Sequence, residues 1–259
     1  MNDFGLSLRE EPQLSAVLAH LPGFCRMLEV PGSVLDSAQL RRRVADKCGG
    51  MALEWGVRDL LDAGLARRLA EEGESLRFEA LRKFESRARA ALACGASWAS
   101  FDLDAGRAVV DAEYGRKALF LMRQLGGILE KLKHDWSLYI PVRIPAPGEA
   151  AEPTRLLKFF HELPLPQFGL VFELHPHEPG ALAWDGMEKL RFHARLWRIC
   201  FDPTSGNKLA PAALSRFLAD DGLAPEPLRI LFSPEGASAA DDYTMTQLSE
   251  TAEKWGKNK

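Results

Sequence analysis

The sequence is poor in the features that mark secreted and membrane proteins. Only four of its 259 residues are cysteines, and no two of them form a Cys-x-x-Cys pair. Cysteines scattered in this way are typical of reduced thiols in a cytosolic protein. The N-terminus lacks a basic region followed by a long apolar stretch, and no apolar run approaches the roughly 18 residues of a membrane span. We therefore expect a cytoplasmic protein without a signal peptide or a membrane contact.

The chain also lacks an excess of either charge. Lys and Arg number 33 against 36 for Asp and Glu, which gives a formal net charge of −3. A surface for nucleic acid or anionic lipid would need a basic excess. No Gly-x-Gly-x-x-Gly pattern follows any predicted strand, so dinucleotide binding has no support in the sequence. These absences exclude nucleic acid, membranes and dinucleotides as expected partners.

What the sequence does contain is a regular alternation of short apolar runs and longer helical patterns. The runs predict strands at residues 4–8, 24–30, 51–55, 97–104, 138–144, 169–172, 196–201 and 228–232. The helical patterns include 38–48, 76–94, 113–134, 155–163, 180–194, 210–218 and 246–255. Parallel strands need such crossover helices, and eight units in about 250 residues match a closed barrel. We predict an α/β fold, a (β/α)8 TIM barrel forming a single domain over residues 1–259. An open doubly wound sheet is the alternative.

The stretch 168–177 carries the clearest local pattern. Glu173 and His175 follow an apolar run and are two residues apart, so on a strand they face the same side. Pro176 then ends the regular ladder because it lacks a backbone donor. A carboxylate and an imidazole side by side at a strand end can bind a metal or move a proton. A solvated strand end with a capping histidine is the simpler interpretation, but other strands repeat the pattern.

Nearly every predicted strand ends in a charged side chain. In a barrel the carboxyl ends of the strands converge on one face, where active sites lie. The other charged groups collected there are Arg9, Glu29, Glu54, Asp102, Asp104, Arg143, Asp202 and Glu235, and His177 lies just past the sixth strand. Several carboxylates crowded in one mouth would raise some pKa values or recruit a cation. Arg143 could neutralise part of that charge or bind a carboxylate or phosphate of a substrate.

Several local patterns resemble the xylose isomerase-like TIM barrels, the sugar phosphate isomerase/epimerase superfamily. Residues 77–84 running into 94–102 look like the family's third helix and fourth strand. Residues 51–56 are similar to its strand ends in Gly-x-x-x-x-Glu, and 168–173 look like its sixth strand. The resemblance covers nearly the whole chain as an order of strands, and it implies the same barrel fold.

The resemblance also implies a divalent metal ion, which that family holds with Glu, Asp, His and Glu from its last four strands. In this chain the matching position of the fifth strand holds Arg143, and that of the sixth strand holds Glu173. The matching position of the seventh strand falls near Cys200, with Asp202 just beyond it, and that of the eighth strand falls near Ser233. An arginine in place of a carboxylate opposes a second cation, so the usual metal site is degenerate here.

The function implied is that of a sugar or sugar-phosphate isomerase or epimerase, which moves a proton on a small carbohydrate-type substrate. The predicted catalytic residues are Glu173, His175, Glu54 and Asp102, and the predicted substrate-binding residues are Arg143, Asp202 and His177. A relocated site for one divalent ion (Mn, Zn, Co or Fe) would use Glu173, His175 and Asp202. Without a metal, Arg143 would be the electrophile.

The alternative is a non-catalytic barrel that binds a metabolite or a protein partner after losing the metal site. The eroded ligand set favours it, and the fold cannot decide because one barrel hosts many functions. The sequence leaves open whether the chain is active and whether it forms a homo-oligomer.

Overall fold

The computed structural model describes residues 3–61, 74–132, 136–144, 153–163, 168–175, 194–202, 229–234 and 242–257. Its strands are β1 (Asp3–Ser7), β2 (Met27–Pro31), β3 (Glu54–Arg58), β4 (Trp98–Ser100), β5 (Ser137–Ile144), β6 (Phe168–Leu174), β7 (Ala194–Phe201) and β8 (Arg229–Pro234). They form a closed barrel in sequence order, and β1 pairs in parallel with both β2 and β8. The predicted (β/α)8 TIM barrel is confirmed. The extent of one domain over residues 1–259 stays a prediction.

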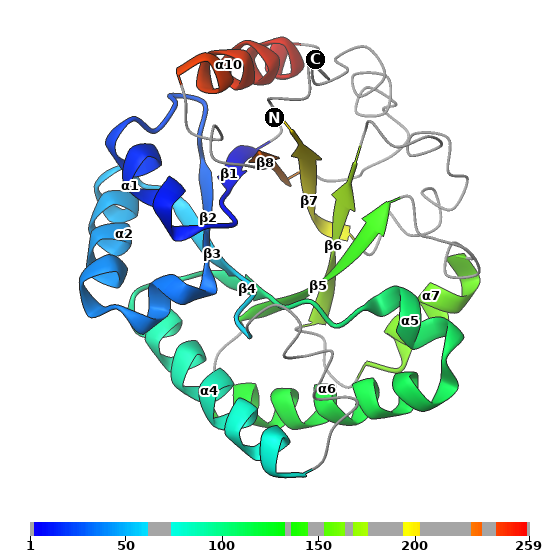
Figure 1. Cartoon of the computed structure of the whole chain (residues 1–259). Coiled ribbons are helices and arrows are strands. Elements are labelled where there is room, and N and C mark those ends of the chain that lie inside the picture. The colour runs from blue at the N-terminus through cyan, green and yellow to red at the C-terminus, as the bar shows by residue number, and fades with distance from the viewer. Residues whose placement is uncertain are drawn as a thin grey trace.

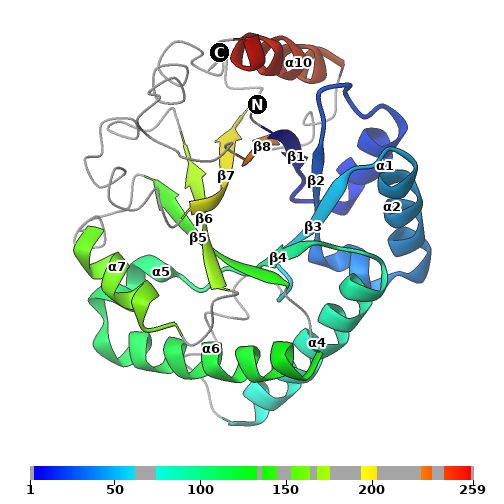
Figure 2. The same ribbon diagram turned by 180° about the vertical axis from the view of Figure 1, so that it is seen from behind.

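The helices lie around the outside of the ring of strands (Figure 1), and the view from behind shows the same arrangement (Figure 2). They are α1 (Glu11–Ala19), the 3-10 helix η1 (Gly32–Asp36), α2 (Ala38–Gly50), α4 (Glu74–Ala93), α5 (Ala105–Val110), α6 (Ala112–Leu132), α7 (Pro153–His161) and α10 (Asp242–Lys257). No helix in the described part of the chain is both long enough and apolar enough to cross a membrane. The helices predicted at 180–194 and 210–218 fall outside the described residues.

Helix α6 shows why these segments pack on the barrel. Its buried residues include Tyr114, Ala118, Leu121 and Leu125, which recur every three or four positions and so form one apolar stripe. The helix starts after Asp111, whose carboxylate accepts hydrogen bonds from the first backbone N–H groups, including that of Tyr114. Such a cap satisfies donors that have no partner inside the helix.

The strands alternate between two environments. In β7, Trp197, Ile199 and Phe201 belong to the apolar core between barrel and helices, whereas Leu196 belongs to a separate cluster inside the barrel. Because successive side chains of a strand point to opposite faces, Arg198 also points into the barrel. Every strand therefore contributes to an outer core and to the interior of the ring.

The interior has an apolar layer, defined by six buried side chains. They are Met27, Trp98, Tyr139, Val171, Leu196 and Leu231. Gly56 on β3 makes room for the largest of them, since a Cβ atom at Gly56 would lie 2.1 Å from the indole of Trp98. Arg229 covers the same ring, with its guanidinium carbon 4.9 Å from the ring centroid. This layer fills the barrel below the site.

The third strand lies later in the chain than the sequence predicted. The prediction was 51–55, whereas β3 runs from Glu54 to Arg58. Helix α2 continues to Gly50, and Ala52 then turns with a positive φ of 52°, so the strand starts late. Gly56, which directly follows the predicted strand, lies inside β3 and accommodates Trp98. This shift changes which residues reach the mouth of the barrel.

Candidate active site

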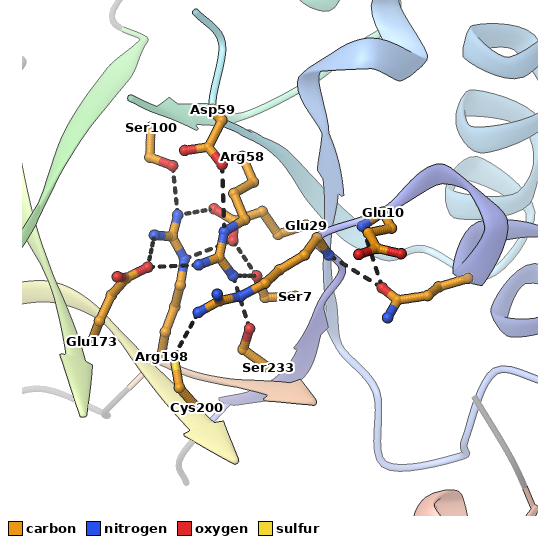
Figure 3. A network of polar contacts seen from close by, with 12 residues as sticks. Ser7, Glu10, Glu29, Arg58, Asp59, Ser100, Glu173, Arg198, Cys200 and Ser233 are labelled. Carbon is orange, nitrogen blue, oxygen red and sulfur yellow. Dashed lines mark hydrogen bonds and ion pairs between the residues drawn. The ribbon is translucent and has the colours of Figure 1, made fainter. Parts of the chain in front are cut away.

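Above the apolar layer, towards the carboxyl ends of the strands, the barrel interior is polar and charged. We call this set the charged layer, and seven strands contribute to it (Figure 3). Its members are Ser7, Glu29, Arg58, Ser100, Glu173, Arg198 and Ser233. Each follows a residue of the outer core by one position, so strand alternation alone directs it inward.

Arg198 lies at the centre of the charged layer and is 0% exposed. Its Nε and Nη2 donate to the two oxygens of Glu29, at 2.7 and 2.5 Å, which is a bidentate pair. Nη2 also donates to the Ser100 hydroxyl, and Nη1 donates to Glu173 Oε1 at 2.9 Å. Burial opposes the charge of the guanidinium, but the two carboxylates raise the pKa of Arg198. It is therefore a permanent cation inside the barrel.

Arg58 is the second cation of the charged layer. Its Nη1 donates to the hydroxyls of Ser7 and Ser233, at 3.0 and 2.8 Å. Its Nη2 donates to Glu173 Oε1 at 2.7 Å. One oxygen of Glu173 therefore accepts from both arginines.

Glu29 is the carboxylate on the opposite side of Arg198 from Glu173, and it is fully buried. It also accepts hydrogen bonds from the Ser7 hydroxyl at 2.6 Å and from the Trp98 indole at 3.3 Å. Burial favours the neutral acid, but Arg198, Arg58 and Ser7 hold the pKa of Glu29 below its ordinary value. Glu29 is therefore a buried, ionised partner of Arg198 and not a charge exposed to solvent at a strand end.

Glu173 differs from Glu29 because it is partly open. Its side chain is 17% exposed, and its second oxygen, Oε2, accepts no hydrogen bond from any described residue. Burial works against its charge, but Arg58 and Arg198 lower the pKa of Glu173 to about 2. It is thus ionised at neutral pH, with one oxygen fixed by arginines and the other free to accept from a ligand.

The predicted metal site does not fit these contacts. Among the described residues, no three His, Cys, Asp or Glu side chains are grouped closely enough to hold a metal ion. Glu173 is already bound by two guanidinium groups, which would repel a further cation beside it. Two guanidiniums and two carboxylates also cancel in charge, so nothing in the charged layer recruits a cation. Glu173 is therefore unsuited to hold a divalent ion with His175 and Asp202.

Other predicted residues do lie at the mouth. Strand pairing puts Arg143, Glu173 and Arg198 in one row across β5, β6 and β7. Arg143 is exposed, whereas His175 and Asp202 directly follow β6 and β7 and are half-buried. The structure thus brings Arg143, His175 and Asp202 close in the fold to Glu173, with roles that it does not test.

The first strand adds a further cation to the mouth. Arg9 follows β1, and its Nη2 lies 3.6 Å from the Cys200 sulfur. Burial, together with Glu173, raises the pKa of Cys200, so the thiol stays protonated. Cys25 and Cys200 are buried, and all four cysteines are unpaired, as their scattered positions in the sequence predicted.

Glu54 is placed at the wrong end of the barrel for its predicted catalytic role. It is the first residue of β3, so it lies at the amino end of the strand, away from the mouth. There it accepts a hydrogen bond from Arg229, the first residue of β8, at 2.7 Å. The strand boundary was placed too early, so Glu54 does not lie at the mouth where its predicted catalytic role would place it, and that role stays an untested prediction.

Asp102 and Asp104 follow β4 at the mouth, and both serve the local backbone. Asp102 accepts from the backbone N–H of Asp104 at 3.0 Å, and Asp104 caps α5 by accepting from Arg107 at 3.1 Å. Asp102 is half-buried and remains a candidate, whereas Asp104 is a helix cap. His177 and Glu235 lie outside the described residues.

The sequence interpretation missed Arg58, Asp59 and Arg198. Arg198 stands in the middle of the apolar run 196–201, where a charged residue in a buried strand is itself a sign of an interior partner. Arg58 and Asp59 were missed because the third strand was predicted to end at residue 55, three residues before its actual end at Arg58. Asp59 has a positive φ of 53°, and its Oδ2 lies 3.8 Å from Arg58 Nε.

Comparison with known proteins shows the fold. No family model matches the sequence, and no curated protein has a matching sequence. Among solved structures, the 3-keto-D-glucoside 4-epimerase YcjR of E. coli aligns with a TM-score of 0.68 at 11% identity, covering 97% of this chain and 99% of that one. The D-psicose 3-epimerase of Clostridium cellulolyticum H10, solved with D-tagatose, gives 0.67 at 10% identity, with coverages of 98% and 97%.

A different enzyme also aligns. A GH18 chitinase from Pseudoalteromonas aurantia gives a TM-score of 0.58 at 10% identity, covering 96% of this chain and 100% of that one. Identities this low establish shared architecture but not shared chemistry. The resemblance to the xylose isomerase-like TIM barrels is therefore confirmed at the level of the fold.

Proposed function

We propose that the protein is a sugar isomerase/epimerase-like barrel that binds a small carbohydrate-type molecule at its mouth and moves a proton on it without a divalent metal ion. The observation that supports this is the pair Arg58 and Arg198, fixed inside the barrel by Glu29 and Glu173. In the family that the sequence resembles, a metal ion supplies positive charge near the substrate oxygens. Here the guanidiniums of Arg58 and Arg198 are proposed to supply positive charge locally, in a layer that is neutral as a whole.

The open oxygen of Glu173 gives this site a means of holding a polyhydroxylated molecule. A carboxylate with a pKa of about 2 is ionised at neutral pH, so it accepts hydrogen bonds and does not donate them. Glu173 is accordingly proposed to bind a substrate hydroxyl. Arg143 and Asp202 are proposed to bind other substrate groups, and His175 and Asp102 to take part in proton transfer. All of these residues follow or end strands at the same end of the barrel.

The second candidate is the non-catalytic barrel that binds a metabolite. The observation that favours it is the mutual satisfaction of the charged layer, in which Glu29, Glu173 and Arg198 bind one another. A carboxylate whose pKa is about 2 is also a weak base. Under this alternative the charged layer would only fill and stabilise the barrel interior, and the mouth would bind a metabolite without catalysing a reaction.

A cytoplasmic location and a small-molecule partner belong to the same proposal. The unpaired state of all four cysteines supports the location. Two measurements then test the function itself.

The first is metal content by mass spectrometry on untagged protein purified without chelators, compared with Glu173→Gln. We expect far less than one divalent ion per chain in both proteins. A stoichiometric ion that is present in the wild type and lost in the variant would contradict the proposal.

The second measurement separates the two candidates. The protein is incubated in D₂O with a panel of aldoses and ketoses, including D-fructose and D-tagatose, with and without a terminal phosphate. Proton NMR then follows both binding, by saturation transfer, and loss of the hydrogen next to the carbonyl. Binding with exchange supports the isomerase/epimerase-like function, and binding without exchange supports the non-catalytic barrel.

A further inference from the structure

We propose that Asp59 is the residue that carries the proton at this mouth, on a polyhydroxylated carbonyl compound with a hydrogen on the neighbouring carbon. This inference rests on the proposed function and deepens it. Asp59 directly follows Arg58, the last residue of β3, so it lies at the carboxyl end of a barrel strand. Residues in that position commonly carry the chemistry of such barrels.

The carboxyl group of Asp59 is open to a ligand. Its side chain is 34% exposed, and no described residue donates a hydrogen bond to it. Its nearest cation is Arg58, whose Nε lies 3.8 Å from Oδ2, too far for a hydrogen bond. Figure 3 shows Asp59 next to Arg58 and across the site from Glu173. A substrate group can therefore reach this carboxyl without displacing a protein donor.

The backbone at Asp59 has an unusual conformation and is closely packed. Asp59 has a φ of 53°, in the left-handed region that non-glycine residues rarely adopt. The neighbouring Gly32 of η1 approaches so closely that a Cβ atom there would lie 2.3 Å from the Asp59 carbonyl oxygen. The next residue, Leu60, donates its N–H to the Ser100 carbonyl at 2.8 Å. A strained residue clamped from two sides is a common feature of catalytic sites.

Arg58 links the two open carboxyl groups. It contacts Asp59 through Nε and Glu173 through Nη2, so both carboxyls border one guanidinium. Arg58 Nε makes no hydrogen bond with any described residue, although the side chain is only 6% exposed. This N–H faces the Asp59 carboxyl without a hydrogen bond to it, so it is available to a ligand oxygen that enters between the two carboxyls.

The two carboxyls are suited to different tasks. Burial raises the pKa of Asp59; Glu173 and Glu29 raise it further, and Arg58 and Arg198 oppose the rise. The same arginines lower the pKa of Glu173 to about 2. Pairs of carboxyls with opposite shifts mark a division between proton carrier and fixed anion. Asp59 is the carrier, and Glu173 holds a substrate hydroxyl.

The proton transfer balances without any other reactant. The Asp59 carboxylate removes the proton from the carbon next to the carbonyl, and the electrons of the broken C–H bond form the C=C bond of an enediolate. The carbonyl pair moves to oxygen, next to the N–H of Arg58. Asp59, now neutral, exchanges its proton with solvent. If it returns a proton to the same carbon from the same side, the result is exchange without net reaction. If it delivers the proton to the former carbonyl carbon, while the proton of the neighbouring hydroxyl passes through solvent to the other enediolate oxygen, the result is an isomerisation, and no oxidant or reductant is needed.

The test is the exchange assay in D₂O with Asp59→Asn. Asparagine tolerates a positive φ and keeps the size of the side chain, so the backbone is preserved while the ionisable group is lost. Asp46→Asn is the matched control, since Asp46 is exposed on α2 and away from the mouth. We expect Asp59→Asn to slow exchange about 100-fold or more without loss of sugar binding, because general base catalysis contributes this much.

A pH profile separates a catalytic role from a structural one. The carboxylate form takes the proton, so the wild-type rate should rise with pH through the raised pKa of Asp59 and then level off. Asp59→Asn should lose this rise, whereas Asp46→Asn should keep it. A variant that only perturbs the structure would lower the rate at every pH and leave the shape unchanged.

The binding and exchange results together test the role of Asp59 separately from the proposed function. Loss of exchange with binding retained supports the role of Asp59. Unchanged exchange in Asp59→Asn overturns that role and leaves the proposed function standing. Binding without exchange by the wild type overturns the role of Asp59 and favours the non-catalytic barrel. No binding of any sugar in the panel overturns the proposed function, and the role of Asp59 with it.

Discussion

The same strands contribute side chains to two layers of opposite polarity inside the barrel. The apolar layer packs Met27, Trp98 and Leu231 against one another, with no exposure above 5% for any member. The charged layer, two residues further along each strand, contains four ionised side chains held by one another. A shift of two residues along β2, from Met27 to Glu29, is enough to pass from one layer to the other.

The two layers also differ in how much stability the protein loses when one of their side chains is substituted. Apolar packing loses stability in proportion to the volume removed, so each change costs a limited amount. A charge network inside a barrel depends on balance, because removal of one partner leaves another charge buried alone. The charged layer is therefore the more sensitive of the two to a single substitution.

Substitution of the central arginine should give the largest effect. Arg198→Met leaves Glu29 fully buried without its main partner, and breaking such a pair destabilises a protein by about 3–5 kcal/mol. Urea unfolding followed by circular dichroism would measure the change. The double variant Arg198→Met with Glu29→Gln should recover much of it, since the uncompensated charge is gone. Equal losses in the single and double variants would refute the charge-balance explanation.

Acid should destabilise the charged layer by a smaller amount. The pKa of Glu173 falls from an ordinary 4.5 to about 2 on folding, so its contribution is complete above pH 4.5 and is lost as the pH falls towards 2. One pKa unit corresponds to about 1.4 kcal/mol, so the free energy of unfolding should drop by about 2 kcal/mol between pH 4.5 and about pH 3. Urea titrations at several pH values would show the slope, which should be shallower in Glu173→Gln.

The apolar layer supplies the control for this pH dependence. Leu231→Ala should remove about 3 kcal/mol at every pH, because it deletes buried methyl groups and no titrating group. Parallel pH curves for this variant and the wild type would confirm that the dependence belongs to the charged layer. A slope that changed with Leu231→Ala would mean that the two layers are not energetically separate.

The smallest effect is expected at the amino end of the barrel. Glu54 and Arg229 form an ion pair with side chains 44% and 25% exposed, and surface pairs contribute less than about 1 kcal/mol. Glu54→Gln should therefore change stability little and leave sugar binding intact. Loss of binding in the NMR assay, despite a normal unfolding curve, would contradict the assignment of the mouth to the other end.

The barrel could be predicted because its signal is repeated along the whole chain. Each strand appears as a short apolar run, so an error in one run does not alter the count. The position of Glu173 was also predictable, since an uninterrupted run leads to it. The site was harder because it depends on exact boundaries. One misplaced end, at Gly56, brought Glu54 to the mouth and removed Arg58 and Asp59 from it.

Arg198 illustrates a second limit. An arginine among Leu196, Trp197 and Ile199 gives no indication of its partners, which come from other strands. Glu29 lies 169 residues away along the chain. Only the closure of the ring brings Arg198 next to Glu29, so the pairing could not be derived from local spacing. The metal prediction failed to anticipate this because it considered only carboxylates and histidines at the strand ends.

That long separation between Glu29 and Arg198 has a consequence for how the protein folds. During synthesis β2 emerges long before β7, so the acid of β2 lacks its bidentate partner until most of the chain has been made. A half-barrel that buried Glu29 early would have Arg58 of β3 nearby but not the two hydrogen bonds that Arg198 donates, in a medium of low polarity. We therefore expect the first strands to stay loosely packed until the late ones arrive, so that distant strands order together when the ring closes.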